Sequence, residues 1–490
     1  MSMKSSLEEL TQRNAAAANG DEKKVAEQAK AGKQTARQRI AAVLDAGSFV
    51  EVSKLSQSVA NVPGYAAVSA VGEGVVTGFG TIDERPVYVY AQDYTVLNGS
   101  MSKAHAEKIV KIMDMAQKNG APVIGFLDCG GARIEEGAAA MEAFGMIAKK
   151  LSILSGLIPT ICVVAGPVVG GLAYVASLHD FTVTVKGVAS MLLYGPQIDE
   201  DAQTIGSAES QAAVTATAQF LAENEADAAV CVKSLLSYLP ANNLEEPPAL
   251  LCEDDLNRML PQFEGESPVD TKEMIAGIAD NGIVLEYAAE YAQNIITAFA
   301  RINGYVVGVV ANSNGAALDA KAARKAARFV SLMDAYNIPV ITLAASEDMP
   351  ASQLADQHCV IKGIATLISA YTQASVPMIT VYVGNVASTG LAAMCSKALG
   401  ADMVYAWANA VISAMPVHAG ALTLYKDMPQ SEALEKYVTE YASAFAAAKQ
   451  GLVDDVIAPS ATRQMIAAAL EACVMKRETP MPKKHCILPL

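Results

Sequence analysis

The chain repeats itself, and this repeat limits the possible folds more than any other feature of the 490 residues. In the first half, the stretch KAHAEKIVKIMDMAQKNG precedes an apolar run that opens near Pro122; in the second half, AKAARKAARFVSLMDAYN precedes a run that opens near Pro339. A later pair of apolar runs opens at Pro159 and Pro377. The two offsets (339 − 122 = 217 and 377 − 159 = 218) are almost constant. One structural unit has therefore been duplicated.

Each copy shows the same order of patterns. Apolar residues at helical spacing are followed by a short buried run, a glycine-containing loop, a second helix and a second buried run. Upstream, Gly72 to Asp93 has the alternation and the turn glycines of a β-meander, and Asn303 to Asn312 repeats its last strand. Continuous apolar strands that alternate with helices indicate a parallel or mixed sheet covered on its faces. The sequence thus predicts an α/β fold, made twice.

Length and composition set the expected domain organisation. A chain of 490 residues exceeds what one ordinary hydrophobic core serves. We expect a helical N-terminal segment at residues 1–45, a first domain at 46–240, a linker at 241–270 and a second domain at 271–490. The linker prediction rests on a stretch rich in Pro, Asn, Glu and Asp.

Charge and hydropathy exclude several classes of protein. The net charge of −15 argues against nucleic acid as a partner, because phosphates attract a basic surface. Apolar residues make up 52% of the chain but come in short blocks, so we expect no membrane insertion. The N-terminus lacks the apolar core of a signal peptide, which predicts a cytoplasmic location. Isolated histidines and scattered cysteines predict no metal site.

Glycines follow a buried strand of the first copy. Gly166, Gly170 and Gly171 stand where ICVVAGPVV ends and the next helix begins. Backbone N–H groups at a helix start can stabilise a developing oxyanion, and glycine lets a ligand approach them closely. The alternative is that these glycines only permit close packing of helix on strand. The repeat favours the first interpretation, so we assign Gly170 and Gly171 to catalysis.

The second copy keeps part of this pattern. Its segment VYVGNVASTGLAAM retains Gly384 and Gly390 but has Ser388 and Thr389 where a glycine pair would be expected. Since an amide donor needs no particular side chain, we predict a second oxyanion hole at Thr389 and Gly390. Two such holes, facing each other, would hold two carbonyl-type groups.

A second glycine-rich cluster, CGGARIEEG, follows another buried strand of the first copy. We assign Gly130, Gly131, Ala132 and Arg133, together with Gly166, to substrate binding. Arg133 would either orient the loop or meet a phosphate, whereas the acidic residues after it also suit ordinary capping of a helix. Six basic residues near the N-terminus form a solvated helix face or help to bind a polyphosphate tail: Lys23, Lys24, Lys30, Lys33, Arg37 and Arg39.

These motifs resemble those of the carboxyltransferase (β-type) subunits of biotin-dependent acyl-CoA carboxylases, the propionyl-CoA and acetyl-CoA carboxylase family, and of related decarboxylases. The matching blocks span nearly the whole chain in the family's order: KQTARQRIAAVLDAGSFVE, GEGVVTGFGTI, AQDYTVLNGSMSKAHAEKI, PVIGFLDCGGARIEEG, KALGADMVYAW, GLVDDVIAP and PKKHCILPL. The resemblance implies a tandem pair of crotonase-like domains.

The resemblance also implies an activity. Such subunits transfer a carboxyl group between carboxybiotin on a carrier protein and the α-carbon of a short-chain acyl-CoA, acetyl-CoA or propionyl-CoA, through an enolate. The Gly170 and Gly171 amides would polarise the thioester, and the Thr389 and Gly390 amides would hold the ureido oxygen of biotin, or the two roles would be exchanged. The implied partners are a biotin carboxyl carrier protein, a biotin carboxylase subunit and further copies of the chain, often in a hexamer.

The second half departs from the family pattern. Where many members have a glycine loop and a YGGAY or FGSAY element, this chain reads SEDMPASQLADQHCVIKGIATL and VASTGLA. Three functions stay open: a carboxylase subunit, the carboxyltransferase subunit of a decarboxylase that feeds a membrane sodium pump, and a structural subunit with a degenerate biotin site. A crotonase-type hydratase is disfavoured, because nothing in the sequence pairs Glu135, Glu136 or Glu142 across a pocket.

Overall fold

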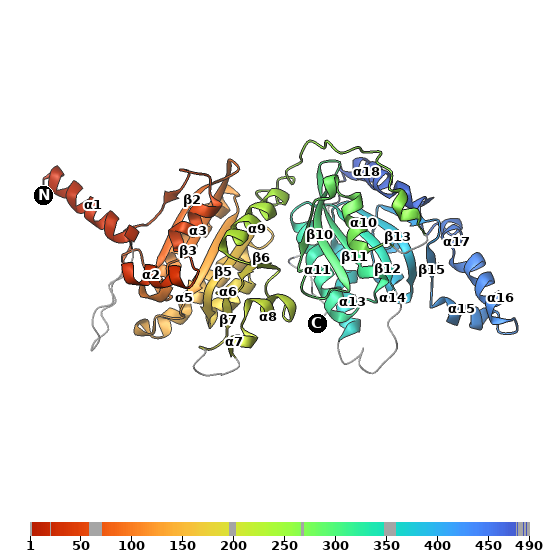
Figure 1. Cartoon of the computed structure of the whole chain (residues 1–490), viewed down its shortest axis with the longest axis horizontal. Coiled ribbons are helices and arrows are strands. Elements are labelled where there is room, and N and C mark those ends of the chain that lie inside the picture. The colour runs from red at the N-terminus through yellow and green to blue at the C-terminus, as the bar shows by residue number, and fades with distance from the viewer. Residues whose placement is uncertain are drawn as a thin grey trace. The chain divides into compact units, whose positions relative to one another are not determined.

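The computed structural model describes residues 2–19, 21–57, 71–195, 202–265, 269–346 and 359–476, with residues 478, 484 and 487 (Figure 1). The chain divides into two compact units, Met1–Glu245 and Glu246–Leu490. The described stretch 239–260 contains no helix or strand. No helix within the described residues combines the length and the apolar character needed to cross a membrane.

The first unit begins with three helices and continues with a sheet and its covering helices. Its elements are α1 (Met3–Asn19), α2 (Glu22–Lys30), α3 (Ala36–Val43), β1 (Val50–Glu51), β2 (Val75–Ile82), β3 (Arg85–Gln92), η1 (Leu97–Gly99), α4 (Lys103–Asn119), β4 (Val123–Cys129), η2 (Ile134–Glu136), α5 (Ala138–Leu154), β5 (Thr160–Val169), α6 (Gly171–Ser177), β6 (Phe181–Val185), β7 (Ser190–Leu192), α7 (Ala202–Ile205), α8 (Ala208–Ala213), β8 (Phe220–Ala222) and α9 (Glu225–Tyr238).

The second unit repeats this plan and adds helices before its last strand. Its elements are η3 (Pro261–Glu264), α10 (Thr271–Ile278), η4 (Asp280–Gly282), β9 (Val284–Tyr287), β10 (Ile295–Ile302), β11 (Tyr305–Asn312), η5 (Ser313–Gly315), α11 (Ala320–Ala335), β12 (Val340–Ser346), α13 (Val360–Gln373), β13 (Met378–Ala387), α14 (Ser388–Ala393), η6 (Lys397–Leu399), β14 (Met403–Trp407), β15 (Val411–Ser413), α15 (Val417–Leu424), α16 (Gln430–Tyr437), η7 (Val438–Ala442), α17 (Ala444–Lys449), β16 (Asp455–Ile457), η8 (Pro459–Ala461) and α18 (Thr462–Cys473).

The two sheets have the same topology. Their strand orders are β1-β2-β3-β4-β5-β6-β8, with β7 beside β5, and β9-β10-β11-β12-β13-β14-β16, with β15 beside β13. The first three strands of each sheet are antiparallel and the others are parallel. The predicted duplicated α/β fold with mixed sheets is therefore confirmed.

A buried lysine marks the duplication inside the cores. Lys108 of α4 and Lys325 of α11 stand 217 residues apart (325 − 108), the same offset as in the sequence repeat. Lys108 Nζ donates to the carbonyl oxygens of Gly72 and Val75, at 2.8 and 2.6 Å. Lys325 Nζ donates to those of Tyr291 and Ile295, at 2.8 and 2.9 Å. In both helices burial lowers the pKa of the lysine to about 8. Each lysine ties its helix to backbone before or within the antiparallel hairpin.

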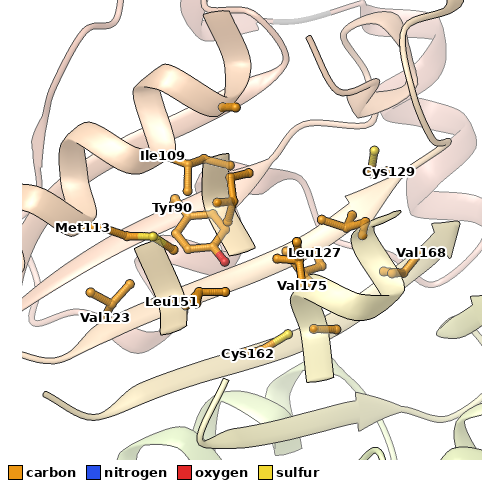
Figure 2. Packing of buried hydrophobic residues seen from close by; sticks show 14 of the residues in the cluster. Tyr90, Ile109, Met113, Val123, Leu127, Cys129, Leu151, Cys162, Val168 and Val175 are labelled. Atoms are coloured by element: carbon orange, nitrogen blue, oxygen red, sulfur yellow. The ribbon is translucent and has the colours of Figure 1, made fainter. Parts of the chain in front are cut away.

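Side-chain alternation along β4 decides which residues meet which layer. Val123, Leu127 and Cys129 point into the core formed with α4 and α5, where Figure 2 shows them with Ile109 and other buried side chains. Neighbouring positions along a strand face opposite ways, so Asp128 points to the other face of the sheet, toward α3. Of the last two residues of β4, Asp128 therefore contacts the α3 side of the sheet and Cys129 the α4 and α5 side. The loop that follows β4 is anchored on both faces of the sheet.

Two buried histidines lie in the first unit, and we expect them to make it sensitive to acid. His179 is 1% exposed, with Nε2 3.0 Å from Tyr90 Oη and Nδ1 2.9 Å from the Val175 carbonyl oxygen. Burial lowers the pKa of His179 to about 4, and that of His105 to about 3. Below its ordinary pKa of about 6.5 a histidine binds protons in the unfolded chain but not in this fold. Stability is therefore highest above that pH and falls as pH drops toward 4.

The test is His179→Gln, followed in urea by circular dichroism at pH 6.5, 5.5 and 4.5. Between the ordinary histidine pKa and the lowered pKa of His179, this residue alone lowers the free energy of unfolding by about 3 kcal/mol, at about 1.4 kcal/mol per pKa unit. The variant should have a flatter pH dependence, whatever its stability at pH 7. His418→Gln, an exposed position in the second unit, is the control. Fluorescence of Trp407, the single tryptophan, reports the second unit separately. An unchanged slope in the His179 variant would contradict the prediction.

Candidate active site

The candidate site lies where strands β4 and β5 of the first unit end side by side. Cys129 pairs with Val168 after a shift in the strand register. A Cβ placed on Gly131 would lie 4.0 Å from Cβ of Val169, so the loop after β4 passes close to the end of β5. The two glycine clusters predicted from the sequence, Gly130–Ala132 and Gly170–Gly171, are thus brought to one edge of the sheet.

Strand β5 has different neighbours along its length, and this opens the edge. Ile161 to Val164 pair with β6, whereas Pro167 to Val169 pair with β7. In the second unit, β13 pairs first with β14 and then, from Asn385 to Ala387, with β15. The carboxyl end of each long strand therefore leaves its first neighbour. Helix α6 in the first unit and helix α14 in the second therefore start beyond the point where β6 or β14 pairs with the long strand.

At this edge the backbone N–H groups of Gly171 and Ala132 have no hydrogen-bond acceptor among the described residues. Gly171 is the first residue of α6, where N–H groups have no partner inside the helix. Around Ala132, Met101 N–H donates to the Gly131 carbonyl oxygen (2.9 Å) and Arg133 N–H donates to that of Met101 (2.8 Å). This pairing brackets Ala132, whose own N–H points away from Met101.

The two glycines predicted to be catalytic have different local roles. Gly170 N–H donates to the Leu192 carbonyl oxygen at 2.9 Å, and its φ of 67° makes the turn into α6. Gly171 keeps its N–H available, and a Cβ there would lie 2.6 Å from the ring of Phe144. The sequence predicts that Ala132 binds substrate, and the structure adds that its N–H is available. Its availability comes from a bridge to Met101, which no local pattern announces.

Gly166 lies before the edge and makes room for a carboxylate. A Cβ on Gly166 would lie 2.0 Å from Oδ1 of Asp128, which is fully buried. Asp128 Oδ1 accepts from Lys33 Nζ at 2.8 Å and Oδ2 from Arg39 at 2.9 Å. Burial raises the pKa of Asp128, and the two cations oppose that rise. In this position Gly166 contacts the Asp128 carboxylate, and its role in substrate binding stays a prediction.

Most of the basic N-terminal residues are engaged in the fold. Arg39 is 2% exposed and also binds Glu225 through two nitrogens at 2.9 Å. Arg37 pairs with Glu51 at 2.7 Å. On α2, Lys23 and Lys30 are exposed, so binding of a polyphosphate tail stays a prediction for that helix.

Arg133 is turned into the protein. Its side chain is 2% exposed and one guanidinium nitrogen donates to Glu73 Oε2 at 2.7 Å. Further bonds reach Ser100 Oγ and the Ser100 carbonyl oxygen, both at 3.3 Å. Of the two roles considered from the sequence, this geometry favours orientation of the loop over contact with a phosphate. Gly130, by contrast, is exposed at the loop surface.

The second unit has a related edge at the end of β13. Ser388 has a φ of 44°, in the left-handed region where the first unit has Gly170 (388 − 170 = 218). The N–H groups of Thr389 and Gly390 make no hydrogen bond within the described part of the chain. A Cβ on Gly390 would lie 2.6 Å from Ser346 Cβ. The departing segment of the sequence lies partly in 347–358, outside the described residues.

A cavity of about 360 Å³ adjoins this second edge. It begins at Leu391, directly after Gly390, and is bounded by β15 and by the added helices. Its lining is mostly apolar, with a few hydroxyl and amide groups: Leu391, Ile412, Ser413, Ala414, Met415, Gly420, Thr423, Leu424, Tyr437, Tyr441, Gln450 and Leu452. Such a combination suits a small ligand with an apolar body and few polar atoms.

Comparisons with known proteins agree with one another. The family model described as the carboxyl transferase domain matches residues 27–488. The methylmalonyl-CoA decarboxylase subunit alpha of Veillonella parvula is 40% identical over 96% of both chains. The propionyl-CoA carboxylase beta chain of Roseobacter denitrificans is 38% identical over 100% of both. The crystal structure of transcarboxylase 12S, a hexamer with methylmalonyl-coenzyme A bound, matches with a TM-score of 0.95 and 35% identity over 100% of both chains.

The strained backbone of Ser388 gives a stability prediction. The left-handed conformation costs a residue with a Cβ about 1–2 kcal/mol. Glycine avoids this cost but loses about 0.5–1 kcal/mol more conformational entropy on folding. We expect Ser388→Gly to raise the free energy of unfolding of the second unit by about 0.5–1 kcal/mol, read from Trp407 fluorescence in urea. Ser388→Ala keeps the strain and should change little. A glycine variant no more stable than the alanine variant would refute this account of Ser388.

Proposed function

The chain belongs to the carboxyl transferase domain family, and on that premise we propose that it moves a carboxyl group between biotin on a carrier protein and the α-carbon of propionyl-CoA. The observation that carries the proposal is the pair of available N–H groups, Ala132 and Gly171, at one edge of the first sheet. Two amide donors at such an edge are what a thioester oxygen requires when it becomes an enolate oxygen.

The relatives support the choice of substrate pair. One is named for decarboxylation of methylmalonyl-CoA, another for carboxylation of propionyl-CoA, and the solved structure holds methylmalonyl-coenzyme A. These names describe the two ends of one reaction. We therefore propose methylmalonyl-CoA and propionyl-CoA as the substrates of this chain, in preference to acetyl-CoA.

The first unit would stabilise the charge that develops on the thioester. When the bond between the α-carbon of methylmalonyl-CoA and its carboxylate breaks, the electron pair moves into the thioester, whose oxygen becomes negative. The Ala132 and Gly171 amides donate to that oxygen. Bound biotin would supply the nitrogen that takes up the released carbon dioxide and would return its proton to the α-carbon, so that atoms and charge balance. Preorganised donors need no rearrangement during this step.

The second unit would hold biotin, whose ureido group supplies the nitrogen that exchanges carboxylate for a proton. Its residues fit that group: Thr389 and Gly390 offer two amide donors for a ureido oxygen, and the adjoining apolar cavity of about 360 Å³ fits the rings and the chain of biotin. The buried contact of Gly390 with Ser346 keeps the donors close to the sheet.

The proposed reaction also implies partners for the chain. The chain would assemble with copies of itself, as the hexameric transcarboxylase core does. It would work with a biotin carboxyl carrier protein in the cytoplasm. A biotin carboxylase subunit would be the further partner if the reaction runs toward carboxylation. The 40% identity to a decarboxylase subunit favours the reverse direction as the second candidate, in which a membrane sodium pump replaces that partner.

The first test of the proposal is turnover by the purified chain. Mixed with methylmalonyl-CoA and free biotin, it should convert the thioester to propionyl-CoA, and omission of biotin should abolish the conversion. Chromatography of the CoA esters measures both. Malonyl-CoA in place of methylmalonyl-CoA ranks the substrates. Binding of the CoA ester without any turnover would instead support a structural subunit.

The position of the Gly171 amide gives a second test. In Gly171→Ala the new methyl group meets the Phe144 ring and must shift the start of α6. A misplaced donor costs on the order of 10- to 100-fold in turnover. Phe144→Ala in the same chain removes the two ring atoms at 2.6 and 2.7 Å and should restore part of the rate.

The matched control is Gly145→Ala, one residue along α5, where an added Cβ meets no atom within 4 Å. It should leave turnover unchanged. Equal losses in the Gly171 and Gly145 variants, or no rescue by Phe144→Ala, would contradict the assigned role of the Gly171 amide.

A further inference from the structure

We propose that Arg133 and Glu73 form a positioning pair for the first site: their buried contact aims the Ala132 N–H at the substrate oxygen. The inference rests on the proposed function of that site. Neither side chain touches the substrate in this proposal, and both act through the backbone between Gly131 and Arg133.

Two hydrogen bonds to Met101 hold the residues on either side of Ala132, and the carboxyl side of this short segment needs a further anchor. Met101 holds Gly131 on one side and Arg133 on the other through two hydrogen bonds of 2.9 and 2.8 Å. The segment after these two hydrogen bonds is a short 3-10 turn in which Ile134 is exposed, while Glu136 accepts from Lys103 N–H at 3.0 Å and lies 3.7 Å from the Arg133 guanidinium. The buried side chain of Arg133, with Glu136 beside it, therefore anchors the carboxyl side of Ala132.

Arg133 is anchored to two separate segments. Its guanidinium donates to Glu73 Oε2 at 2.7 Å and to two oxygens of Ser100 at 3.3 Å. Glu73 is fully buried in the turn before β2, and Ser100 directly precedes Met101. The arginine thus fixes both sides of the bridge that leaves Ala132 N–H available. A planar guanidinium with several donors can do this, whereas an ammonium group makes fewer directed bonds.

Glu73 is held in turn by a chain of buried polar contacts. Its Oε2 accepts from Ser102 Oγ at 3.0 Å, and its carbonyl oxygen accepts from His105 Nδ1 at 2.9 Å. The pKa of His105 is lowered to about 3 by burial, so the ring is neutral and Nε2 accepts from Gln92 at 3.2 Å. The Gln92 side-chain oxygen accepts from Asp128 N–H at 3.1 Å.

These hydrogen bonds connect the two ends of the Gly130–Ala132 loop. Asp128 lies in β4 just before the Gly130–Ala132 loop, and Arg133 lies just after it. One connected set of hydrogen bonds therefore fixes both ends of a six-residue interval, 128–133, and leaves one N–H in it directed outward.

The test compares the wild-type chain with two variants: Glu73→Gln with Arg133→Met in one protein, and Arg133→Lys alone. Removing both partners avoids a buried unpaired charge, which would endanger folding. The direct readout is the infrared stretching band of the thioester carbonyl in bound propionyl-CoA labelled with carbon-13. Donors at that oxygen lower the frequency of the band on binding. Turnover of methylmalonyl-CoA with biotin and the affinity for propionyl-CoA are measured alongside.

We expect the double variant to lose at least half of the frequency shift and about 10- to 100-fold in kcat, with affinity for propionyl-CoA within about 3-fold of wild type. Arg133→Lys should give intermediate values. The matched control is Glu51→Gln with Arg37→Met, another ion pair of the first unit, paired at 2.7 Å. It should keep the full shift.

Either of two results overturns the proposal: a double variant with an unchanged carbonyl shift, or a control with an equal loss. A wild type that shifts the carbonyl band but lacks biotin-dependent turnover would refute the proposed function, and the shift in the double variant would still decide the positioning role. A wild type that binds propionyl-CoA without any shift would refute the positioning role, whatever its turnover.

Discussion

The divided pairing of β5 is the constraint on which the site depends. A strand that kept one neighbour to its end would satisfy its backbone groups within the sheet and would leave no open edge. Because Pro167 to Val169 turn to β7, α6 starts at an edge that β6 does not close. The first N–H groups of a helix have no partner within it, so a donor becomes available there without cost to the sheet. Strand β13 and helix α14 repeat this solution in the second unit.

Buried charge holds the other side of the site in place. Asp128 at the end of β4 is enclosed by Arg39 and Lys33, and Gly166 leaves the space that its carboxylate fills. Ion pairs of this kind contribute little net stability, because desolvation offsets their attraction, but losing one partner is expensive. They therefore fix a unique arrangement more than they add to stability. Here the arrangement fixed is the start of the loop that carries Ala132.

Duplication gave two units with one topology, and the two sites then diverged. The buried lysines of α4 and α11 still make equivalent pairs of bonds to backbone oxygens. At the strand ends the units differ: Gly170 adopts the left-handed backbone at no steric cost, whereas Ser388 adopts it with a Cβ. The second unit also has the helices α15 and α16 and the cavity beside them. A shared backbone plan thus supports amide donors in both units and different ligands beside them.

The sequence by itself determined the duplication, the α/β class, the position of the long strands and helices, and the glycines at the strand ends. These follow from periodicity and from local backbone preferences, which are legible within a few neighbouring residues. Only the tertiary structure decided which N–H groups stay available. The Gly170 N–H donates to the Leu192 carbonyl oxygen, whereas the hydrogen bonds of Met101 to Gly131 and Arg133 leave the Ala132 N–H without an acceptor among the described residues. It also turned Arg133 inward to Glu73, sixty residues away in sequence (133 − 73 = 60). Hydrogen bonds between distant segments depend on strand register and on the packing of whole layers, and neither is encoded in any single local pattern.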